Sequence, residues 1–179
     1  MPYTVMLDAS HGGFDNGATY EGRVEKDETL RLTLAVGEIL QQRGVNVLYT
    51  RTEDIYETPT QKAQEGNVAG ADYFVSIHRN SSPSPNQYTG IESLVYSSHG
   101  PAAEMAANIN SELEAVGFVN HGVNERRNLA ILQRTYMPTV LVEVGFINSD
   151  PDNALFDNQF YNIAYAMANG ILASTPDGA

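Results

Sequence analysis

The sequence contains no cysteine, and this absence excludes several kinds of site at once. Disulfide bonds, iron–sulfur clusters, zinc sites with thiolate ligands and a cysteine nucleophile all require a thiol. Any metal must therefore be held by histidine and carboxylate side chains. The chain offers 4 histidines and 22 acidic residues for that purpose.

Basic residues are also scarce: 10 Lys and Arg stand against 22 Asp and Glu, which gives a formal net charge of -12. This charge repels phosphate backbones and anionic lipid headgroups, so we expect neither nucleic acid nor a membrane as partner. Long hydrophobic runs are missing too, because no stretch approaches the roughly 18 apolar residues that cross a bilayer. The first eight residues lack the features of a signal peptide, so we expect either another export route or an excised domain.

With 179 residues, 42% of them hydrophobic and 18% charged, the chain has the composition of one globular domain. Short β-rich runs alternate with helical stretches and no segment repeats, which is typical of an α/β domain. We therefore predict a single domain over residues 1–174, with a twisted, mostly parallel sheet of about six strands and helices on both faces. The small, polar residues 175–179 predict the start of a linker or tail.

Strands are predicted where short apolar or β-branched runs occur, and helices where apolar residues recur every three or four positions. The predicted strands are residues 4–8, 45–50, 73–78, 91–96, 129–132 and 139–144. The predicted helices are residues 25–43, 59–68, 101–116 and 158–173. Residues 9–24 and 81–89 are rich in turn-forming residues, so we predict loops there.

Polar side chains follow or end three of these predicted strands. His11 comes just after the first strand, His78 ends the third, and Glu143 lies near the end of the last. Because the carboxyl ends of strands form the binding edge of an open α/β sheet, we expect these groups at one edge. Glu25, at the junction of a long loop and the first helix, is a fourth candidate. His11, Glu25 and His78 are the ligand types of catalytic zinc sites, in which one coordination position is left for water.

Each candidate ligand, taken alone, also has a structural explanation. The separations of 14 and 53 residues (25 minus 11, 78 minus 25) match no compact zinc motif. His11 could decorate a glycine-rich loop, His78 could be a hydrogen-bonded core histidine, and Glu25 could complement the helix dipole. Glu143 differs, because a carboxylate flanked by valine is costly to bury unless it is paired or neutralised. Two further histidines lie in turn-like contexts and are predicted to be solvent-exposed: His99 and His121.

Four segments, in order along the chain, carry a family resemblance. They are LDASHGGFDNGA at 7–18, Glu25 with its leucine-rich helix, SIHRNS at 76–81 and MPTVLVEVGFI at 137–147. Together they resemble the zinc-dependent N-acetylmuramoyl-L-alanine amidases of the amidase-3 type, found in bacterial autolysins and phage endolysins. The resemblance covers essentially the whole chain. It implies one Zn²⁺ held by His11, Glu25 and His78, with Glu143 as the catalytic carboxylate.

The resemblance also implies a reaction, the hydrolysis of the amide between the lactyl group of N-acetylmuramic acid and L-alanine of the peptidoglycan stem peptide. The implied setting is the cell wall, outside the cell, and we expect a monomer. Two alternatives stay open: a catalytically weak peptidoglycan-binding module, and a zinc peptidase that cuts within the stem peptide. Because the negative charge disfavours adhesion to anionic wall polymers, we expect a separate wall-binding segment in the parent protein.

The chain departs from the family pattern at a few positions near the predicted ligands. Ala9-Ser10 stands where Pro-Gly is usual, Arg79 replaces a small residue after His78, and Lys62 lies near a position where arginine is common. A long cation beside the metal site would tune substrate affinity or partly close the site. Four polar residues near the motifs are expected to orient ligands or stabilise the fold: Asp8, Asp15, Asn80 and Glu92.

Overall fold

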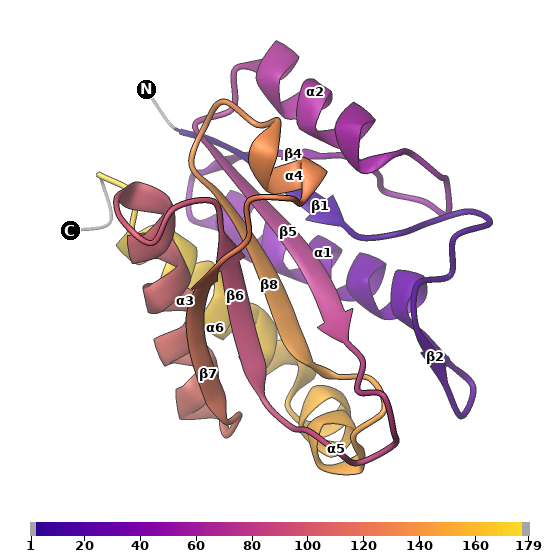
Figure 1. Ribbon diagram of the computed structural model, residues 1–179. Helices are drawn as coiled ribbons and strands as arrows, with labels where there is room; N and C mark the ends of the chain where they lie inside the picture. Colours follow the sequence, from indigo (N-terminus) through magenta and orange to yellow (C-terminus); the bar gives the residue numbers. More distant parts are fainter. Residues whose placement is uncertain (1–2, 177–179) are drawn as a thin grey trace.

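The computed structural model describes residues 3–176 and contains one six-stranded sheet with helices on both faces (Figure 1). The strands are β1 (Thr4–Ala9), β2 (Thr19–Tyr20), β3 (Arg23–Val24), β4 (Asn46–Tyr49), β5 (Tyr73–Asn80), β6 (Ile91–Val95), β7 (Asn120–Glu125) and β8 (Thr139–Phe146). The helices are α1 (Glu25–Gln42), α2 (Pro59–Ala69), α3 (Pro101–Val116), α4 (Ala130–Gln133), α5 (Asp150–Asn158) and α6 (Phe160–Ala173).

The strand order in the large sheet is β4-β1-β5-β8-β6-β7, and β2 and β3 form a separate antiparallel pair. The β6–β8 pair is antiparallel, whereas the other neighbours in the large sheet run parallel. The prediction of a single, mostly parallel α/β sheet is therefore confirmed. No helix among residues 3–176 is long and apolar enough to cross a membrane.

The strands alternate between two hydrophobic cores, one on each face of the sheet. One core lies between the sheet and the helices α1, α3 and α6. It contains odd-numbered residues of β1 and β5 and even-numbered residues of β8: Val5, Leu7, Val75, Ile77, Val140 and Val142. Residues of the opposite parity pack with α2 and α4: Met6, Phe74 and Leu141. This period of two decides which side chains can share a site.

Helices α2 and α4 cover only part of their face of the sheet (Figure 1). The carboxyl-terminal parts of β5 and β8 lie beyond them, without a helix in front. The same parity that places Met6, Phe74 and Leu141 under α2 and α4 directs Asp8, Ser76, His78 and Glu143 to this face. Polar side chains therefore emerge where the helical cover ends.

The short strands β2 and β3 lie within residues 9–24, where only a loop was predicted. Three further elements also differ from the predictions. The apolar run at 129–132 forms the single helical turn α4 rather than a strand, because the Leu129 carbonyl accepts the backbone N–H groups of Leu132 and Gln133. The edge strand β7 was not predicted, since its sequence NHGVNE is polar. The helix α5 was also missed, although Ser149 caps it by accepting a hydrogen bond from the Asp152 backbone N–H.

The predicted tail is described only in part, because residues 177–179 lie outside the described residues. Thr175 is buried, and its hydroxyl donates to the Leu172 carbonyl oxygen at 2.8 Å. This residue therefore closes the end of α6.

Candidate active site

Three side chains that are far apart in the sequence converge at the carboxyl edge of the sheet. The Nε2 atom of His11 lies 3.1 Å from Oε2 of Glu25, and Nδ1 of His78 lies 3.6 Å from Oε1 of the same carboxylate. One ligand atom from each of the three residues lies within 4.8 Å of the other two. Two imidazoles and one carboxylate in this arrangement could hold a metal ion.

The loop after β1 places His11 through an unusual backbone conformation. His11 has a φ of 63°, and the next residue, Gly12, has a φ of 131°. A Cβ atom on Gly12 would lie 2.0 Å from the Ile55 carbonyl oxygen, so only glycine fits there. Gly17 is equally restricted, because its Cβ would lie 2.6 Å from both Glu25 Oε2 and His11 Cδ2. The glycines of this loop therefore leave room for the two ligand side chains.

Glu25 opens α1 and is buried, with 3% of its surface exposed. Its Oε2 atom accepts the backbone N–H of Ala18 at 2.9 Å, and Oε1 accepts the backbone N–H of Arg79 at 3.0 Å. Burial alone would raise the pKa of Glu25, but hydrogen bonds with His11 and His78 and their charges hold it well below its usual range. The carboxylate therefore stays ionised between the two imidazoles.

Asp15 holds the ring of His11 in one orientation. Its Oδ2 atom lies 2.8 Å from His11 Nδ1, so Nδ1 donates to Asp15 and Nε2 faces Glu25. Burial would lower the pKa of His11, but Glu25 and Asp15 outweigh it and raise this pKa to about 9. Without a metal, His11 therefore carries a proton at neutral pH.

Glu143 lies beside the three converging residues, on the neighbouring strand. It is paired in register with His78 of β5 on one side and with Glu92 of β6 on the other. Its Oε2 atom is buried and has no hydrogen-bond partner within the described part of the chain. Burial raises the pKa of Glu143 to about 7, against the opposing charge of His78 and with a further contribution from Glu25. A carboxyl group with this pKa can both accept and release a proton near neutral pH.

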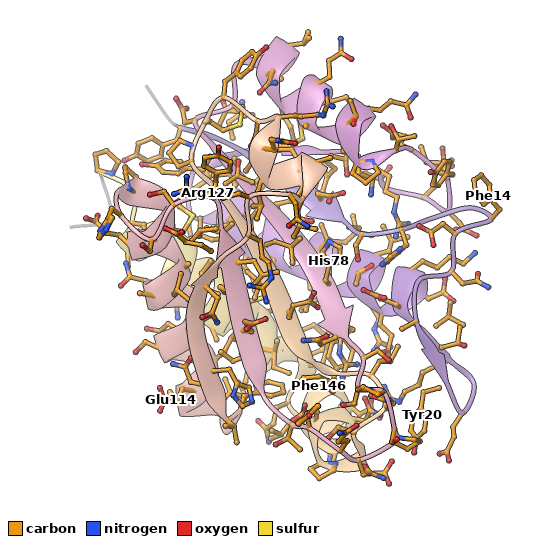
Figure 2. All side chains as sticks on the ribbon, viewed as in Figure 1. Phe14, Tyr20, His78, Glu114, Arg127 and Phe146 are labelled. Carbon is orange, nitrogen blue, oxygen red and sulfur yellow. The ribbon has the colours of Figure 1, made fainter. Side chains whose placement is uncertain are left out.

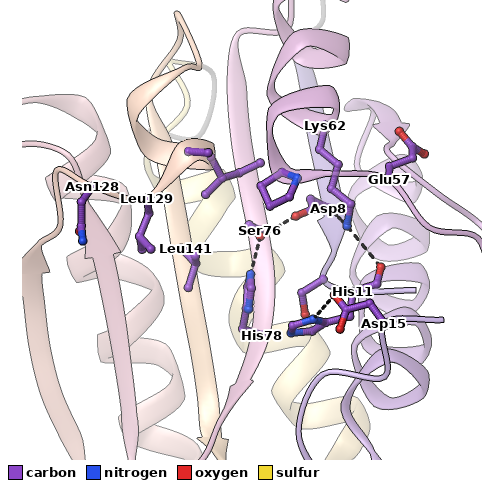
Figure 3. Close-up of a pocket in the computed structure, with 14 residues that line it drawn as sticks. Asp8, His11, Asp15, Glu57, Lys62, Ser76, His78, Asn128, Leu129 and Leu141 are labelled. Carbon is purple, nitrogen blue, oxygen red and sulfur yellow. Dashed lines mark hydrogen bonds and ion pairs between the residues drawn. The ribbon is translucent and has the colours of Figure 1, made fainter. Parts of the chain in front are cut away.

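A cavity of about 220 Å³ lies between α2 and α4 and reaches His11 and His78 (Figure 3). One wall is largely apolar and is formed by Leu129, Ala130, Ile131 and Leu141. The opposite wall carries Lys62 of α2 and Glu57 of the loop before it. In Figure 2, His78 lies on the front of β5, below α2 and α4. His11 and His78 therefore face open space rather than the hydrophobic core.

The side chain of Arg79 does not lie beside the candidate metal site, although its backbone N–H donates to Glu25, so the sequence interpretation of a cation there was wrong. The residue follows His78 on β5, and strand alternation turns its side chain to the opposite face of the sheet. There the guanidinium is buried, donates to Glu28 at 2.7 Å and lies 4.3 Å from the centre of the Phe156 ring. It also donates to the Asn153 side chain. Arg79 therefore ties β5 to α1 and α5 and does not reach the substrate side.

Replacing Arg79 with alanine is expected to destabilise the fold by about 3–5 kcal/mol, because Glu28 would lose a buried charge partner and Phe156 its stacking contact. Urea unfolding followed by circular dichroism measures this change. Near-normal stability together with a raised KM would instead put the guanidinium at the substrate.

The remaining sequence candidates have ordinary surroundings. His99 and His121 are exposed, as predicted. Glu92 accepts a hydrogen bond from the Asn124 amide at 2.8 Å, and the Asn80 side chain accepts the N–H of Ser81. None of these four residues belongs to the group that could bind a metal.

The sequence interpretation gave no role at the site to two residues that lie near it, Ser76 and Lys62. Ser76 is fully buried, and its hydroxyl lies 3.1 Å from His78 Nε2. Lys62 is buried on α2, and its ammonium lies 2.8 Å from Asp8 Oδ1. The position of Ser76 two residues before His78 was a usable signal, because residues two apart on a strand share a face. Nothing in the sequence indicated that Lys62 would be buried.

Comparison with known proteins gives one consistent result. The N-acetylmuramoyl-L-alanine amidase family profile matches residues 5–173. The chain is 38% identical over 173 residues to a sporulation-specific N-acetylmuramoyl-L-alanine amidase of Bacillus subtilis, covering 93% of this chain and 66% of that protein. It is 34% identical to the N-acetylmuramoyl-L-alanine amidase CwlM of Bacillus licheniformis, with the same two coverages. The chain thus spans slightly less than two thirds of the length of these curated relatives.

Solved structures agree with the sequence relatives. The crystal structure of an N-acetylmuramoyl-L-alanine amidase from Clostridium difficile 630 superposes with a TM-score of 0.89 at 30% identity. The match covers 96% of this chain and 96% of that one. The similarity therefore extends over the whole fold, including the edge of the sheet where the site lies.

Proposed function

This chain belongs to the N-acetylmuramoyl-L-alanine amidase family, and we propose that it hydrolyses the amide between the lactyl group of N-acetylmuramic acid and L-alanine of the peptidoglycan stem peptide. One observation carries the proposal most. Glu143 presents a carboxylate oxygen that has no hydrogen-bond partner among residues 3–176, next to three side chains that could hold a metal ion. Amide hydrolysis needs both a strong nucleophile and a proton donor for the leaving nitrogen.

We assign the metal as a single Zn²⁺ held by His11, Glu25 and His78. The donor set fits this ion, because two imidazole nitrogens and one carboxylate leave a coordination position for water. When bound, zinc supplies a Lewis acid that polarises the carbonyl and lowers the pKa of a bound water. The ring nitrogens that face Glu25, and that would therefore bind the ion, are His11 Nε2 and His78 Nδ1. At neutral pH, binding would displace the proton held by His11 and so would be weakened by acid.

Glu143 is proposed to move the proton of the reaction. Its Oε2 atom accepts a proton from the attacking water and then delivers it to the nitrogen of L-alanine. A carbon–oxygen bond forms, the carbon–nitrogen bond breaks, and the products are a lactyl carboxylate and a free amino terminus. Burial, which raises the pKa of Glu143 to about 7 in the metal-free protein, favours return of the proton to the leaving nitrogen.

The proposed substrate places the protein at the cell wall, outside the cell, and we propose that it acts there as a monomer. The net charge of -12 disfavours adhesion to anionic wall polymers. A separate wall-binding segment of the parent protein would therefore bring the catalytic domain to its substrate.

Digestion of a defined muramyl peptide, followed by mass spectrometry, tests the proposed reaction. We expect an intact stem peptide with a free L-alanine amino terminus, together with a glycan that retains its lactyl carboxylate. Fragments that begin at later residues of the stem peptide would identify a peptidase. Binding to peptidoglycan without release of any product, in the presence of zinc, would identify a binding module.

A further inference from the structure

A buried chain of hydrogen bonds leads from α2 to His78 and lies outside the group of candidate metal ligands (Figure 3). The Lys62 ammonium lies 2.8 Å from Asp8 Oδ1. The Ser76 hydroxyl lies 2.6 Å from Asp8 Oδ2 and 3.1 Å from His78 Nε2. Three of these four side chains are at least 97% buried, because Lys62 is 3%, Asp8 2% and Ser76 0% exposed.

The direction of each hydrogen bond follows from the donors available. An ionised carboxylate only accepts, and a hydroxyl has a single proton to donate. Burial would raise the pKa of Asp8, but the charge of Lys62 and its hydrogen bonds keep it below its usual range, so Asp8 is ionised. The Ser76 proton is therefore directed to Asp8. The hydroxyl can then only accept from His78, which places a proton on Nε2.

The consequence for His78 is a fixed tautomer. A neutral imidazole with its proton on Nε2 has a lone pair on Nδ1. Nδ1 is the atom that faces Glu25. His11 has the opposite arrangement, because Asp15 accepts from its Nδ1 and Nε2 is the nitrogen that faces the same carboxylate. Ser76 accepts from Nε2 of His78, whereas Asp15 accepts from Nδ1 of His11. The nitrogen that faces Glu25 is therefore Nδ1 in His78 and Nε2 in His11.

Lys62 does more than keep Asp8 charged. Its ammonium also donates to the Ala9 carbonyl oxygen at 2.9 Å and lies 3.4 Å from the His11 carbonyl oxygen. The Thr50 hydroxyl donates to Asp8 Oδ1 at 2.7 Å and completes the shell of that carboxylate. One buried cation therefore connects the loop that carries His11 with the hydrogen bonds that reach His78.

We propose that the buried Lys62–Asp8 ion pair, acting through Ser76, holds His78 in the Nε2-protonated tautomer and so presents Nδ1 to the metal. Lys62, Asp8 and Ser76 are positioning residues here, because they act through His78 and do not belong to the group that could hold the metal. The inference rests on the proposed metal site. Its effect is on metal affinity, since a ring in the wrong tautomer must exchange a proton before it can bind.

The wild-type protein labelled with ¹⁵N-histidine and loaded with Zn²⁺ gives the first test. Two-bond ¹H–¹⁵N correlation spectra distinguish a metal-bound Nδ1 from a metal-bound Nε2. We expect His78 to bind through Nδ1 with its proton on Nε2, and His11 to bind through Nε2. A His78 ring bound through Nε2 would overturn the proposal, even if every variant failed to fold.

Variants of Ser76 give the second test, with zinc affinity measured by competition against a fluorescent chelator. Ser76→Ala is expected to weaken Zn²⁺ binding by about 10- to 100-fold, whereas Ser76→Thr keeps the hydroxyl and should restore most of the affinity. Ser93→Ala is the matched control. Ser93 is also fully buried on a strand, and its hydroxyl contacts Asn110 at 2.6 Å. This control should leave zinc affinity unchanged.

The outcomes separate the two hypotheses. If wild-type protein does not bind Zn²⁺, the proposed metal site fails and the proposed function fails with it. If wild-type protein binds Zn²⁺ and Ser76→Ala binds it equally tightly, only the positioning role is overturned. Equal losses in Ser76→Ala and Ser93→Ala would also overturn it, because they would report a general loss of stability.

Discussion

Replacing Glu143 with glutamine is expected to lower kcat by about 10²–10⁴-fold while zinc remains bound. Glutamine has nearly the same shape as glutamate but cannot accept the proton of the attacking water or return it to the leaving nitrogen. The side chain does not belong to the set that could hold the metal. The loss should therefore appear in turnover and not in metal content.

Release of stem peptide from a defined muramyl peptide measures this effect, with zinc content determined on the same sample. Glu92→Gln is a suitable control, because Glu92 is the register partner of Glu143 on β6 but hydrogen-bonds to Asn124. We expect this control to keep its activity within a few-fold. Substantial hydrolysis by Glu143→Gln would show that another group transfers the proton.

Replacing Glu25 with glutamine is expected to weaken zinc binding by more than about 100-fold, a larger loss than that from removing a hydrogen bond outside the ligand shell. The carboxylate contacts both imidazoles and is held ionised by them. An amide removes the negative charge and leaves two neutral rings to hold a dication. Activity at limiting zinc should fall in parallel with the affinity.

Glu28→Gln is the matched control for this second variant. Glu28 lies three residues further along α1, is also buried, and pairs with Arg79 and Arg23. Its replacement should lower stability in urea but leave zinc affinity at the wild-type value. Unchanged zinc affinity in Glu25→Gln would remove this residue from the ligand set and leave the metal assignment without its carboxylate.

Much of the site could be anticipated from local patterns. The turn after the first strand carries His11 between a buried strand and two glycines, and Glu25 stands at the start of an amphipathic helix. Parallel strands place their carboxyl ends at one edge, so His78 and Glu143 were expected there as well. The ordered motifs then identified the family. The glycine-rich turn, the start of the helix and the ends of the strands each depend on residues close together in the chain, so local sequence patterns predict them.

Arg79 shows an inference that the same patterns could have supported but did not. Because side chains alternate along a strand, the residue after His78 must point to the other face, toward α1 and α5. Because Arg79 follows His78 directly in the sequence, we predicted its side chain at the metal site. The alternation of side chains along β5 instead turns it to the other face, where it forms a buried ion pair with Glu28.

The four candidate residues could thus be named from the sequence, but the distances between them could not. Whether His11, Glu25 and His78 meet depends on the strand order β1-β5-β8 and on how α1 begins, which are long-range contacts. The same holds for Lys62, which is buried only because α2 packs over Asp8. A charge is tolerated inside a protein only when a partner is present. Such partners come from distant segments, so local sequence patterns cannot reveal them and the packed fold decides them.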